Sequence, residues 1–273
     1  MDDERRFNLI DVHVHLEQFS DVERAGVLER ARDAGVRWIL TSGMDVETSR
    51  RAIQLADRHD GVFASVGMHP WNAVDEGHSH YQESIEALAK EQRIVGIGEV
   101  GLDFVDNVFL GVTFHDNPLL MKKQEEVLRW HVQLACTLKL PLLLHCRGAY
   151  SRLLTLLREE DALRVGGVIH NFNADMQTAN LLMDMGFFLS FGGALTYPSA
   201  AELRKIAGSI PIDYILVETD SPYMPIYEQE MEKNEPANVT HVARILNRTK
   251  GMELDAFANA LSKNFARLFL CEG

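Results

Sequence analysis

The sequence predicts an α/β protein in which one domain, residues 1–273, folds as a (β/α)8 barrel with extra C-terminal helices. Eight short apolar runs are spread along the 273 residues, and segments with helical periodicity lie between them. The runs are apolar throughout, which is typical of parallel strands covered on both faces. No Gly-x-Gly-x-x-Gly follows the first run, which weakens the dinucleotide-binding form of the main alternative, a doubly wound open sheet.

The predicted strands are 9–15, 37–42, 62–67, 94–100, 140–146, 166–172, 187–192 and 214–220. Helical periodicity is clear in three of the segments between them: 22–35, 124–139 and 179–186. Because strands and helices alternate, the sheet is expected to be parallel. Eight such units in a chain of this length favour closure into the TIM-barrel architecture.

Two connections are unusually long. Residues 102–123 follow the fourth strand and residues 221–238 follow the eighth, and both are expected to be loops. Loops of this length in a compact domain often face the substrate. Residues 239–270 are expected to form two helices with a glycine-containing break, packed on the outside of the barrel.

The composition limits the partners. The net charge is −13 and the isoelectric point is about 5.3, so a nucleic-acid partner would need a local basic patch or bound cations. Cys136, Cys146 and Cys271 have neither zinc-ribbon nor CxxC spacing, which favours a reduced, cytoplasmic compartment. The N-terminal residues MDDERRF contain no apolar export segment, and no apolar run is long enough to cross a membrane. No membrane contact and no obligate protein partner is expected.

The segment IDVHVHL, residues 10–16, contains the first chemical signal. Side chains alternate along a strand, so Asp11, His13 and His15 share one face, which is expected to point into the barrel. Histidines at positions i and i+2 can bind one cation through their ring nitrogens. The alternative interpretation is a pair of hydrogen-bonded core histidines.

Other metal-capable side chains lie at the ends of further strands. Glu99, His145, His170 and Asp220 fall at the ends of the fourth, fifth, sixth and eighth strands. Barrel enzymes build their active sites at these C-terminal strand ends. Because charged residues are rarely buried without a partner, the set of six predicts a metal site.

Six ligands exceed the needs of one tetrahedral ion. Two divalent ions that share Glu99 are the better interpretation. The expected division gives His13, His15, Glu99 and Asp220 to one ion, and Glu99, His145 and His170 to the other. Nitrogen and oxygen ligands allow Zn, Mn, Fe, Co or Mg without choosing among them.

Six motifs follow one another along the chain: DVHVHL (11–16), GMHP (67–70), GEVGLDF (98–104), LPLLLHCR (140–147), ETDSPYMP (218–225) and NEPANV (234–239). In sequence and order they resemble the motifs of the TatD-type metal-dependent deoxyribonucleases of the amidohydrolase superfamily, and the resemblance covers nearly the whole chain. The resemblance implies the (β/α)8 barrel, and it implies metal ligands at His13, His15, Glu99, His145, His170 and Asp220.

Three features depart from the family pattern. The chain has HNFNA at 170–174 where the family usually has HCFSG, and HCRGA at 145–149 where it often has HSRDA. The loop after Asp103 is also longer than usual. These changes leave the metal ligands intact and alter the groups around the substrate.

The expected reaction is phosphodiester cleavage in DNA. Two ions about 3.5–4 Å apart can hold one hydroxide and polarise a phosphoryl oxygen. Glu99 bridges the ions, and Asp220 accepts the proton of the water and helps to return it to the leaving oxygen. The expected substrate is a DNA strand end, or a small phosphoester or ester. No basic, aromatic-rich stripe is visible, so a short nucleic-acid footprint is expected.

Four further residues are candidates around the site. His69 is expected near the phosphate, and its alternative role is to stabilise a loop. Arg147 can bind a phosphate or carboxylate, or form a salt bridge at the rim. Glu218 is expected to orient a ligand or to close a contact in the barrel interior. Asp103 either orients a ligand or caps the long loop.

Two other functions remain open. One keeps the site and changes the substrate, giving an ester, lactone or amide hydrolase or an aminoacyl-tRNA deacylase. The other is a non-enzymatic barrel that holds metal as a scaffold, and the intact ligand set argues against it.

Overall fold

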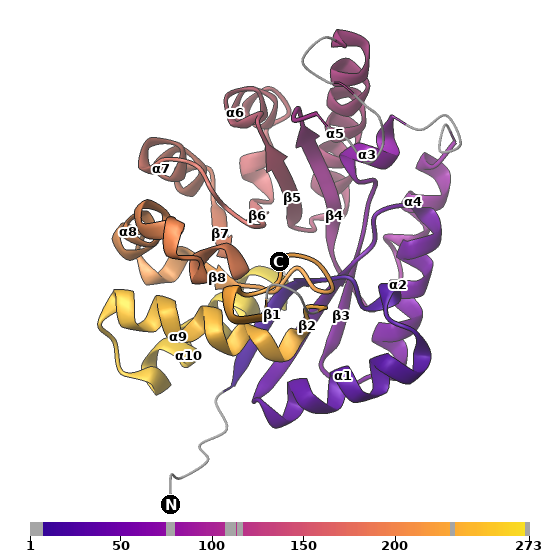
Figure 1. The fold of residues 1–273 in the computed structure, drawn as a ribbon. Coiled ribbons are helices and arrows are strands. Elements are labelled where there is room, and N and C mark those ends of the chain that lie inside the picture. Colours follow the sequence, from indigo (N-terminus) through magenta and orange to yellow (C-terminus); the bar gives the residue numbers. More distant parts are fainter. Residues whose placement is uncertain (1–7, 75–79, 107–112, 114–116, 230–232, 271–273) are drawn as a thin grey trace, which may run out of the picture.

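The barrel predicted from the sequence is confirmed in the computed structural model, which describes residues 8–74, 80–106, 113, 117–229 and 233–270. One eight-stranded parallel sheet runs in the order β1 to β8, with helices around it (Figure 1). The strands are β1 (Leu9–Val14), β2 (Val36–Ser42), β3 (Val62–Val66), β4 (Ile94–Asp103), β5 (Leu142–Arg147), β6 (Gly167–Ile169), β7 (Phe187–Phe191) and β8 (Ile215–Val217).

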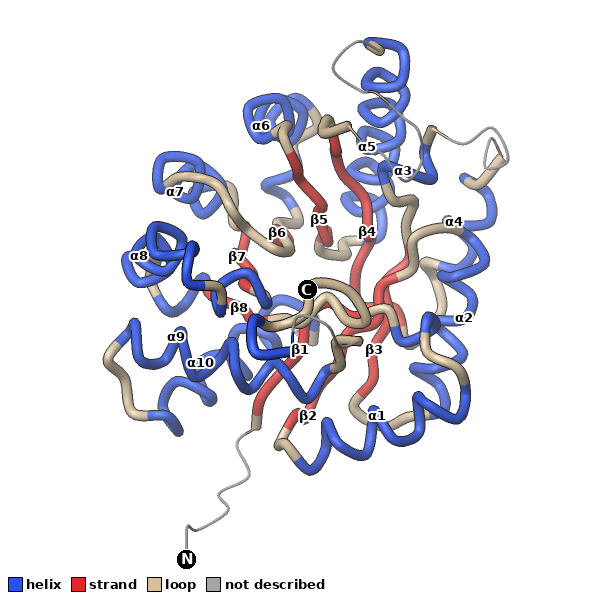
Figure 2. The backbone as a smooth tube through the Cα atoms, viewed as in Figure 1, coloured by secondary structure: helices blue, strands red, loops and turns tan. Residues whose placement is uncertain are grey.

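The helices lie outside the ring of strands, as Figure 2 shows with helices in blue and strands in red. They are α1 (Asp21–Asp33), α2 (Val46–Arg58), α3 (Pro70–Ala73), α4 (Gln82–Leu88), α5 (Pro118–Leu138), α6 (Tyr150–Glu159), α7 (Met176–Asp184), α8 (Ala201–Ser209), α9 (Val239–Lys250) and α10 (Leu254–Phe269). No helix within these described ranges is both long and apolar enough to cross a membrane.

Burial explains why these segments fold as they do. Every residue of β1 and of β4 is buried, as expected for strands with the barrel interior on one face and helices on the other. In α5, Leu128, Val132 and Ala135 are buried at helical spacing and face the strands. Ser20 starts α1 with a capping box to Glu23, which satisfies amide groups at the helix N-terminus.

The ring of strands is nearly closed, and a short seam joins its last strand to its first. The Asp220 amide donates to the His13 carbonyl at 2.9 Å, and the His15 amide donates to the Ser221 carbonyl at 2.7 Å. A parallel bridge pairs Val14 with Ser221. The backbone that closes the barrel is therefore the backbone that carries candidate site residues.

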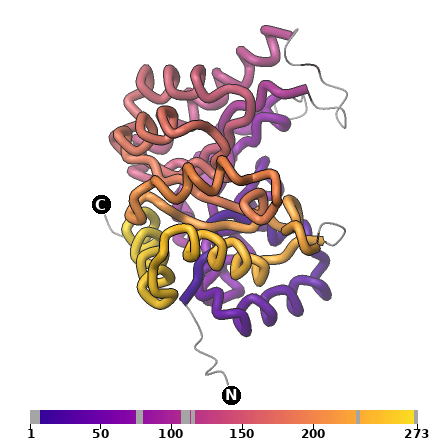
Figure 3. The backbone as a smooth tube through the Cα atoms, turned by 60° about the vertical axis from the view of Figure 1, so that its left-hand side comes forward, coloured from indigo at the N-terminus to yellow at the C-terminus, as the bar shows by residue number. Residues whose placement is uncertain are grey.

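The two C-terminal helices pack outside the barrel, as predicted. In Figure 3 the yellow helices lie beside the indigo first strand. The Asn264 side chain on α10 donates to the Ile215 carbonyl at 2.8 Å, and Phe265 stacks on Trp38 with 5.2 Å between ring centroids. Gly251 ends α9 with a φ of 62°, a conformation that glycine adopts without a side-chain penalty.

The prediction of a loop over residues 102–123 is wrong at both ends of that range. Strand β4 continues to Asp103 because Asp103 pairs with Arg147 of β5. Helix α5 begins at Pro118, where Asn117 caps the helix and proline suits its first turn. The connection is therefore 104–117, of which 107–112 and 114–116 lie outside the described residues. The segment 221–238 also contains 3₁₀ turns, at Tyr227–Gln229 and Pro236–Asn238.

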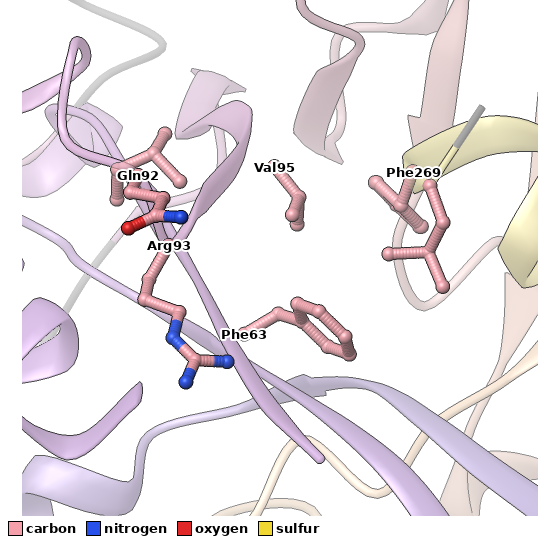
Figure 4. A pocket seen from close by; sticks show the side chains of 7 residues that line it. Phe63, Gln92, Arg93, Val95 and Phe269 are labelled. Atoms are coloured by element: carbon pink, nitrogen blue, oxygen red, sulfur yellow. The ribbon is translucent and has the colours of Figure 1, made fainter. Parts of the chain in front are cut away.

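A cavity of about 390 Å³, whose lining side chains are drawn in Figure 4, lies at the N-terminal end of β4, since Ile94 and Val95 begin that strand. It is lined by Phe63, Gln92, Arg93, Ile94, Val95, Phe269 and Leu270. The lining contains no imidazole and no carboxylate, so this cavity is not suited to the metal chemistry that the sequence predicts.

Candidate metal centre

The structure brings all six predicted ligands together toward the C-terminal ends of the strands, here called the mouth. Glu99 was predicted at the end of the fourth strand, but it lies in the interior of β4 because that strand continues to Asp103. They come from β1 and the residue after it (His13, His15), from β4 (Glu99), from β5 (His145), and from just past β6 and β8 (His170, Asp220). Strands β6 and β8 are shorter than predicted, so His170 and Asp220 lie on the first residues of loops. Their role as ligands stays a prediction.

Glu99 lies at the centre of the cluster. Its Oε2 is 3.2 Å from His13 Nε2 and 3.6 Å from His15 Nε2. Its Oε1 is 3.1 Å from both His145 Nδ1 and His170 Nε2. The two oxygens of one carboxylate therefore face two separate pairs of imidazoles, which is the arrangement that a bridging ligand requires.

Asp220 approaches the first of these pairs. Its Oδ1 is 3.5 Å from His15 Nε2 and 3.8 Å from His13 Nε2. Its other oxygen, Oδ2, accepts a hydrogen bond from Asn171 Nδ2 at 3.2 Å. Asp220 has a φ of 57°, a left-handed conformation that is uncommon for aspartate and is often found at functional sites.

The donor set fits divalent cations. Three groups each place three ligand atoms within 4.8 Å of one another: His13–His15–Glu99, His13–His170–Asp220 and His69–Glu99–His145. Within the described part of the chain, buried His13 Nε2 and Glu99 Oε2 have no hydrogen-bond partner, although they lie 3.2 Å apart. Burying such atoms is costly unless a partner such as a cation compensates them.

The electrostatics of the cluster also favour a cation. Burial alone would lower the pKa of His15, but the Asp220, Glu17 and Glu99 carboxylates raise it to about 9. A site that stabilises a proton so strongly on an imidazole is rich in negative charge. A bound metal ion would satisfy the same carboxylates while keeping the histidines neutral.

His69 differs from the six. It caps α3, and its Nδ1 accepts the Trp71 amide at 3.1 Å, so the ring proton is assigned to Nε2. Burial lowers the pKa of His69 to about 3, so the ring is neutral. Its Nε2 lies 3.4 Å from Glu99 Oε1. The geometry makes His69 a hydrogen-bond donor at the mouth, and the capping contact gives it a loop-stabilising role as well.

Asp103 connects the cluster to the rim. Its Oδ2 is 3.2 Å from His145 Nε2 and accepts the Trp71 indole N–H at 2.9 Å, while Oδ1 accepts Arg147 Nε at 3.0 Å. Burial would raise the pKa of Asp103, but His145 and Arg147 lower it to about 2. Oδ1 also accepts the Val105 amide at 3.1 Å, so Asp103 both orients His145 and caps the start of the loop.

Glu218 and Arg147 also lie where they can act on the site. Glu218 Oε1 is 3.3 Å from His170 Nδ1 and accepts the Asn171 amide at 2.8 Å, so it fixes the orientation of His170. The Arg147 side chain is 42% exposed at the rim, and its guanidinium carbon lies 5.8 Å from the Trp71 ring centroid. Among the described residues, Arg147 bonds Asp103 through Nε, which leaves its two terminal nitrogens for a further partner.

Sequence reasoning gave no role to Asp11 or Asn171. Buried Asp11 accepts the Thr219 amide at 2.9 Å and the Thr219 hydroxyl at 2.6 Å, tying β1 to the segment between Glu218 and Asp220. The sequence did contain a signal for Asp11, because it alternates with His13 and His15 and therefore lies on the same face of the strand. For Asn171, the signal was the departure of HNFNA from the family pattern.

Comparison with known proteins identifies the family of the chain. Residues 10–270 match the family described as TatD related DNase. The uncharacterised metal-dependent hydrolase YabD of Bacillus subtilis is 34% identical over 263 residues, which cover 96% of this chain and 98% of YabD. The 3'-5' ssDNA/RNA exonuclease TatD of Cronobacter sakazakii is 32% identical over 266 residues, which cover 96% of this chain and 97% of its own.

A solved structure shows the same fold. The crystal structure of YjjV, a TatD homologue from Escherichia coli, superimposes with a TM-score of 0.87 at 29% identity and covers 97% of this chain and 98% of its own. The resemblance that the motifs indicated is confirmed. The chain therefore belongs to the TatD family of metal-dependent hydrolases.

Proposed function

We propose that the protein is a nuclease that cleaves phosphodiester bonds in DNA at a site for two divalent ions. The observation that carries the proposal is the position of Glu99, whose two carboxylate oxygens face separate histidine pairs. One ion would be held by His13, His15, Glu99 and Asp220, and the other by Glu99, His145 and His170. When bound, the ions would supply a nucleophilic water near neutral pH and offset the charge of the phosphodiester.

The side chains around the cluster would perform the remaining steps. Asp220 accepts the proton of the attacking water and returns it to the leaving oxygen. His69 donates its Nε2 proton to a phosphoryl oxygen, which its neutral state permits. Arg147, fixed by Asp103, pairs with a neighbouring phosphate through the two terminal nitrogens of its guanidinium. These local groups allow an acidic protein of net charge −13 to bind a polyanion.

The choice of a nucleic-acid substrate is supported by the relative from Cronobacter sakazakii, which is named as an exonuclease on single-stranded DNA and RNA. A short footprint suits the site, because the cluster lies at the C-terminal ends of the barrel strands. The end of a DNA strand can reach the mouth of the barrel. This position of the cluster favours removal of nucleotides from the end of the DNA.

The test uses protein stripped of metal and reloaded separately with Mg, Mn or Zn. End-labelled single- and double-stranded DNA are incubated with the wild type, with Asp220→Asn and with Asp184→Asn, an exposed control on α7. Cleavage that needs metal, is lost in Asp220→Asn and persists in Asp184→Asn supports the proposal. No cleavage with any metal, by protein that binds two ions, would overturn it and direct attention to esters, lactones and aminoacyl-tRNA.

A further inference from the structure

The loop after β8 exposes an unusual set of apolar side chains beside the metal centre. Tyr223 and Tyr227 are each 47% exposed and Met224 is 43% exposed. Of the eight large, exposed apolar side chains in the described residues, these three fall within five consecutive positions. Single exposed apolar residues are ordinary on a protein surface, but Tyr223 and Met224, adjacent in the chain and beside a candidate active site, indicate a binding surface. Tyr227 packs on Tyr197 and does not belong to this surface.

The backbone under these side chains is firmly anchored. The buried Asn234 donates from Nδ2 to the carbonyls of Thr219, Tyr223 and Met224, at 2.9, 2.8 and 3.0 Å. The Tyr223 amide donates to the Asp220 carbonyl at 2.9 Å. Because these hydrogen bonds hold the backbone of the loop, the fold itself keeps Tyr223 exposed, and the exposure does not result from poor packing.

A second segment supports the loop from the side. A Cβ added at Gly193 would lie 2.5 Å from the Met224 carbonyl oxygen, so only glycine permits this approach. The Tyr197 hydroxyl donates to the Pro225 carbonyl at 3.2 Å. Met224 itself has a φ of 46°, a strained conformation for a residue with a side chain. The hydrogen bond from Asn234 to the Met224 carbonyl helps to hold this strained conformation next to Tyr223.

Tyr223 borders the metal centre directly. Its ring centroid lies 5.6 Å from that of His15, and the two planes meet at 64°. Arg147 belongs to β5, which lies four strands from β1 in either direction around the nearly closed ring. The tyrosine and the arginine therefore lie on opposite sides of the cluster, and a phosphodiester bound between them would place one neighbouring group near each.

We propose that Tyr223 is a stacking surface for the nucleobase next to the scissile phosphate, with Met224 extending it. This deepens the proposed nuclease function and rests on it. An aromatic ring fixed in place loses little freedom when a base stacks on it, and stacking tolerates every base because each has a π-face. The surface therefore gives the enzyme a preference for nucleotides over simple phosphodiesters, without a preference among bases.

The test compares dinucleotides that contain one scissile bond. One is thymidylyl-thymidine, and two others each carry an abasic deoxyribose in place of one nucleoside. The proteins are the metal-loaded wild type, Tyr223→Ala, Tyr223→Phe and Tyr227→Ala. Tyr227 is a matched control because it is equally exposed but packs on Tyr197, with 5.5 Å between ring centroids.

For the wild type, loss of the stacked base is expected to lower kcat/KM by about 10- to 100-fold. Tyr223→Ala should show that loss on the intact dinucleotide and no further loss on the corresponding abasic one. Tyr223→Phe and Tyr227→Ala should behave like the wild type. If Tyr223→Ala impairs intact and abasic dinucleotides equally, or impairs neither, the stacking site is overturned while the nuclease function stands. If the wild type cleaves the end-labelled DNA but none of the dinucleotides, the stacking site next to the scissile phosphate is overturned. If it cleaves neither, the nuclease function itself fails.

Discussion

The side chain of Asn171 donates a hydrogen bond from Nδ2 to Asp220 Oδ2 at 3.2 Å, and its backbone amide donates to Glu218 Oε1 at 2.8 Å. Asn171 thus positions two carboxylates, Asp220 and Glu218, at the candidate metal centre. Because Asp220 Oδ2 accepts this hydrogen bond from Asn171, the other oxygen, Oδ1, faces His15. Gly192 provides the space, since a Cβ there would lie 3.0 Å from Asn171 Oδ1.

Replacing Asn171 with alanine should therefore lower kcat more than it changes KM. A hydrogen bond to a charged group contributes about 1.5–3 kcal/mol, so the expected loss in kcat is about 10- to 100-fold. Steady-state kinetics of Asn171→Ala on any substrate that the wild type hydrolyses measures both constants. The control is Asn173→Ala, an exposed asparagine in the same segment. Equal losses in the two variants would contradict a positioning role for Asn171.

Glu218→Gln should weaken metal binding. The substitution removes the charge beside His170 Nδ1, 3.3 Å away, which orients the ring and increases the basicity of its other nitrogen. Loss of such a supporting carboxylate typically lowers metal affinity by about 10- to 100-fold. Competition titration with a chromogenic chelator measures the effect, and the exposed Glu202→Gln on α8 is the control. Unchanged affinity in Glu218→Gln would show that His170 does not depend on this contact for binding metal.

The parts of the site that follow from local pattern could be predicted from the sequence. Alternation along a strand places His13 and His15 on one face, and the rule that barrel sites lie at strand ends brings in Glu99 and His145. The contacts that orient these groups could not be predicted. Asp11 and Thr219 are 208 positions apart, and nothing in either segment alone indicates that their side chains meet.

His131, which is buried in α5, should make the free energy of unfolding vary with pH. Burial lowers its pKa to about 4, and its ring stacks on Tyr81 with 5.6 Å between centroids. In the unfolded chain the pKa is about 6.5. The stabilising contribution is therefore complete above pH 6.5 and is lost as the pH falls from 6.5 toward 4, by up to ~3 kcal/mol.

His131→Phe should remove this part of the pH dependence. Urea unfolding of the metal-free protein at pH 7.5 and pH 5 gives the change in the free energy of unfolding, and the other histidines contribute equally in both proteins. The exposed His80→Phe should keep the full wild-type dependence. A pH dependence in His131→Phe as steep as that of the wild type would show that His131 titrates normally in the folded state.

Gly101→Ala should destabilise the barrel and displace a candidate ligand. A Cβ at Gly101 would lie 1.9 Å from the His145 carbonyl oxygen, so β4 and β5 would have to separate. Overpacking of this kind costs about 1–3 kcal/mol, and thermal unfolding should show a melting temperature lower by several degrees. Gly26→Ala, within α1, meets only the flexible end of Arg30 and should be neutral or slightly stabilising. Equal melting temperatures for Gly101→Ala and the wild type would contradict this account.

Element boundaries were the weakest part of the sequence-based prediction, for a physical reason. Strand β4 continues to Asp103, which pairs with Arg147 of β5, and the Gln124 side chain supports this strand end by accepting the Asp103 amide at 2.9 Å and donating to its carbonyl at 3.1 Å. A side chain of α5 thus takes over the backbone bonding of a strand end. Hydropathy along the chain does not record such bonds, so it placed a loop where the strand continues.

The seam between β8 and β1 has a consequence for the dynamics of the site. The amides of Asp220 and His15 bond across it, so any fluctuation that opens the ring also separates the metal-capable side chains. Slow hydrogen exchange at these two amides would report that the site is assembled, and their exchange rate would measure how often it comes apart. The candidate metal centre and the join between the two ends of the sheet therefore form one cooperative unit, which opens and closes together.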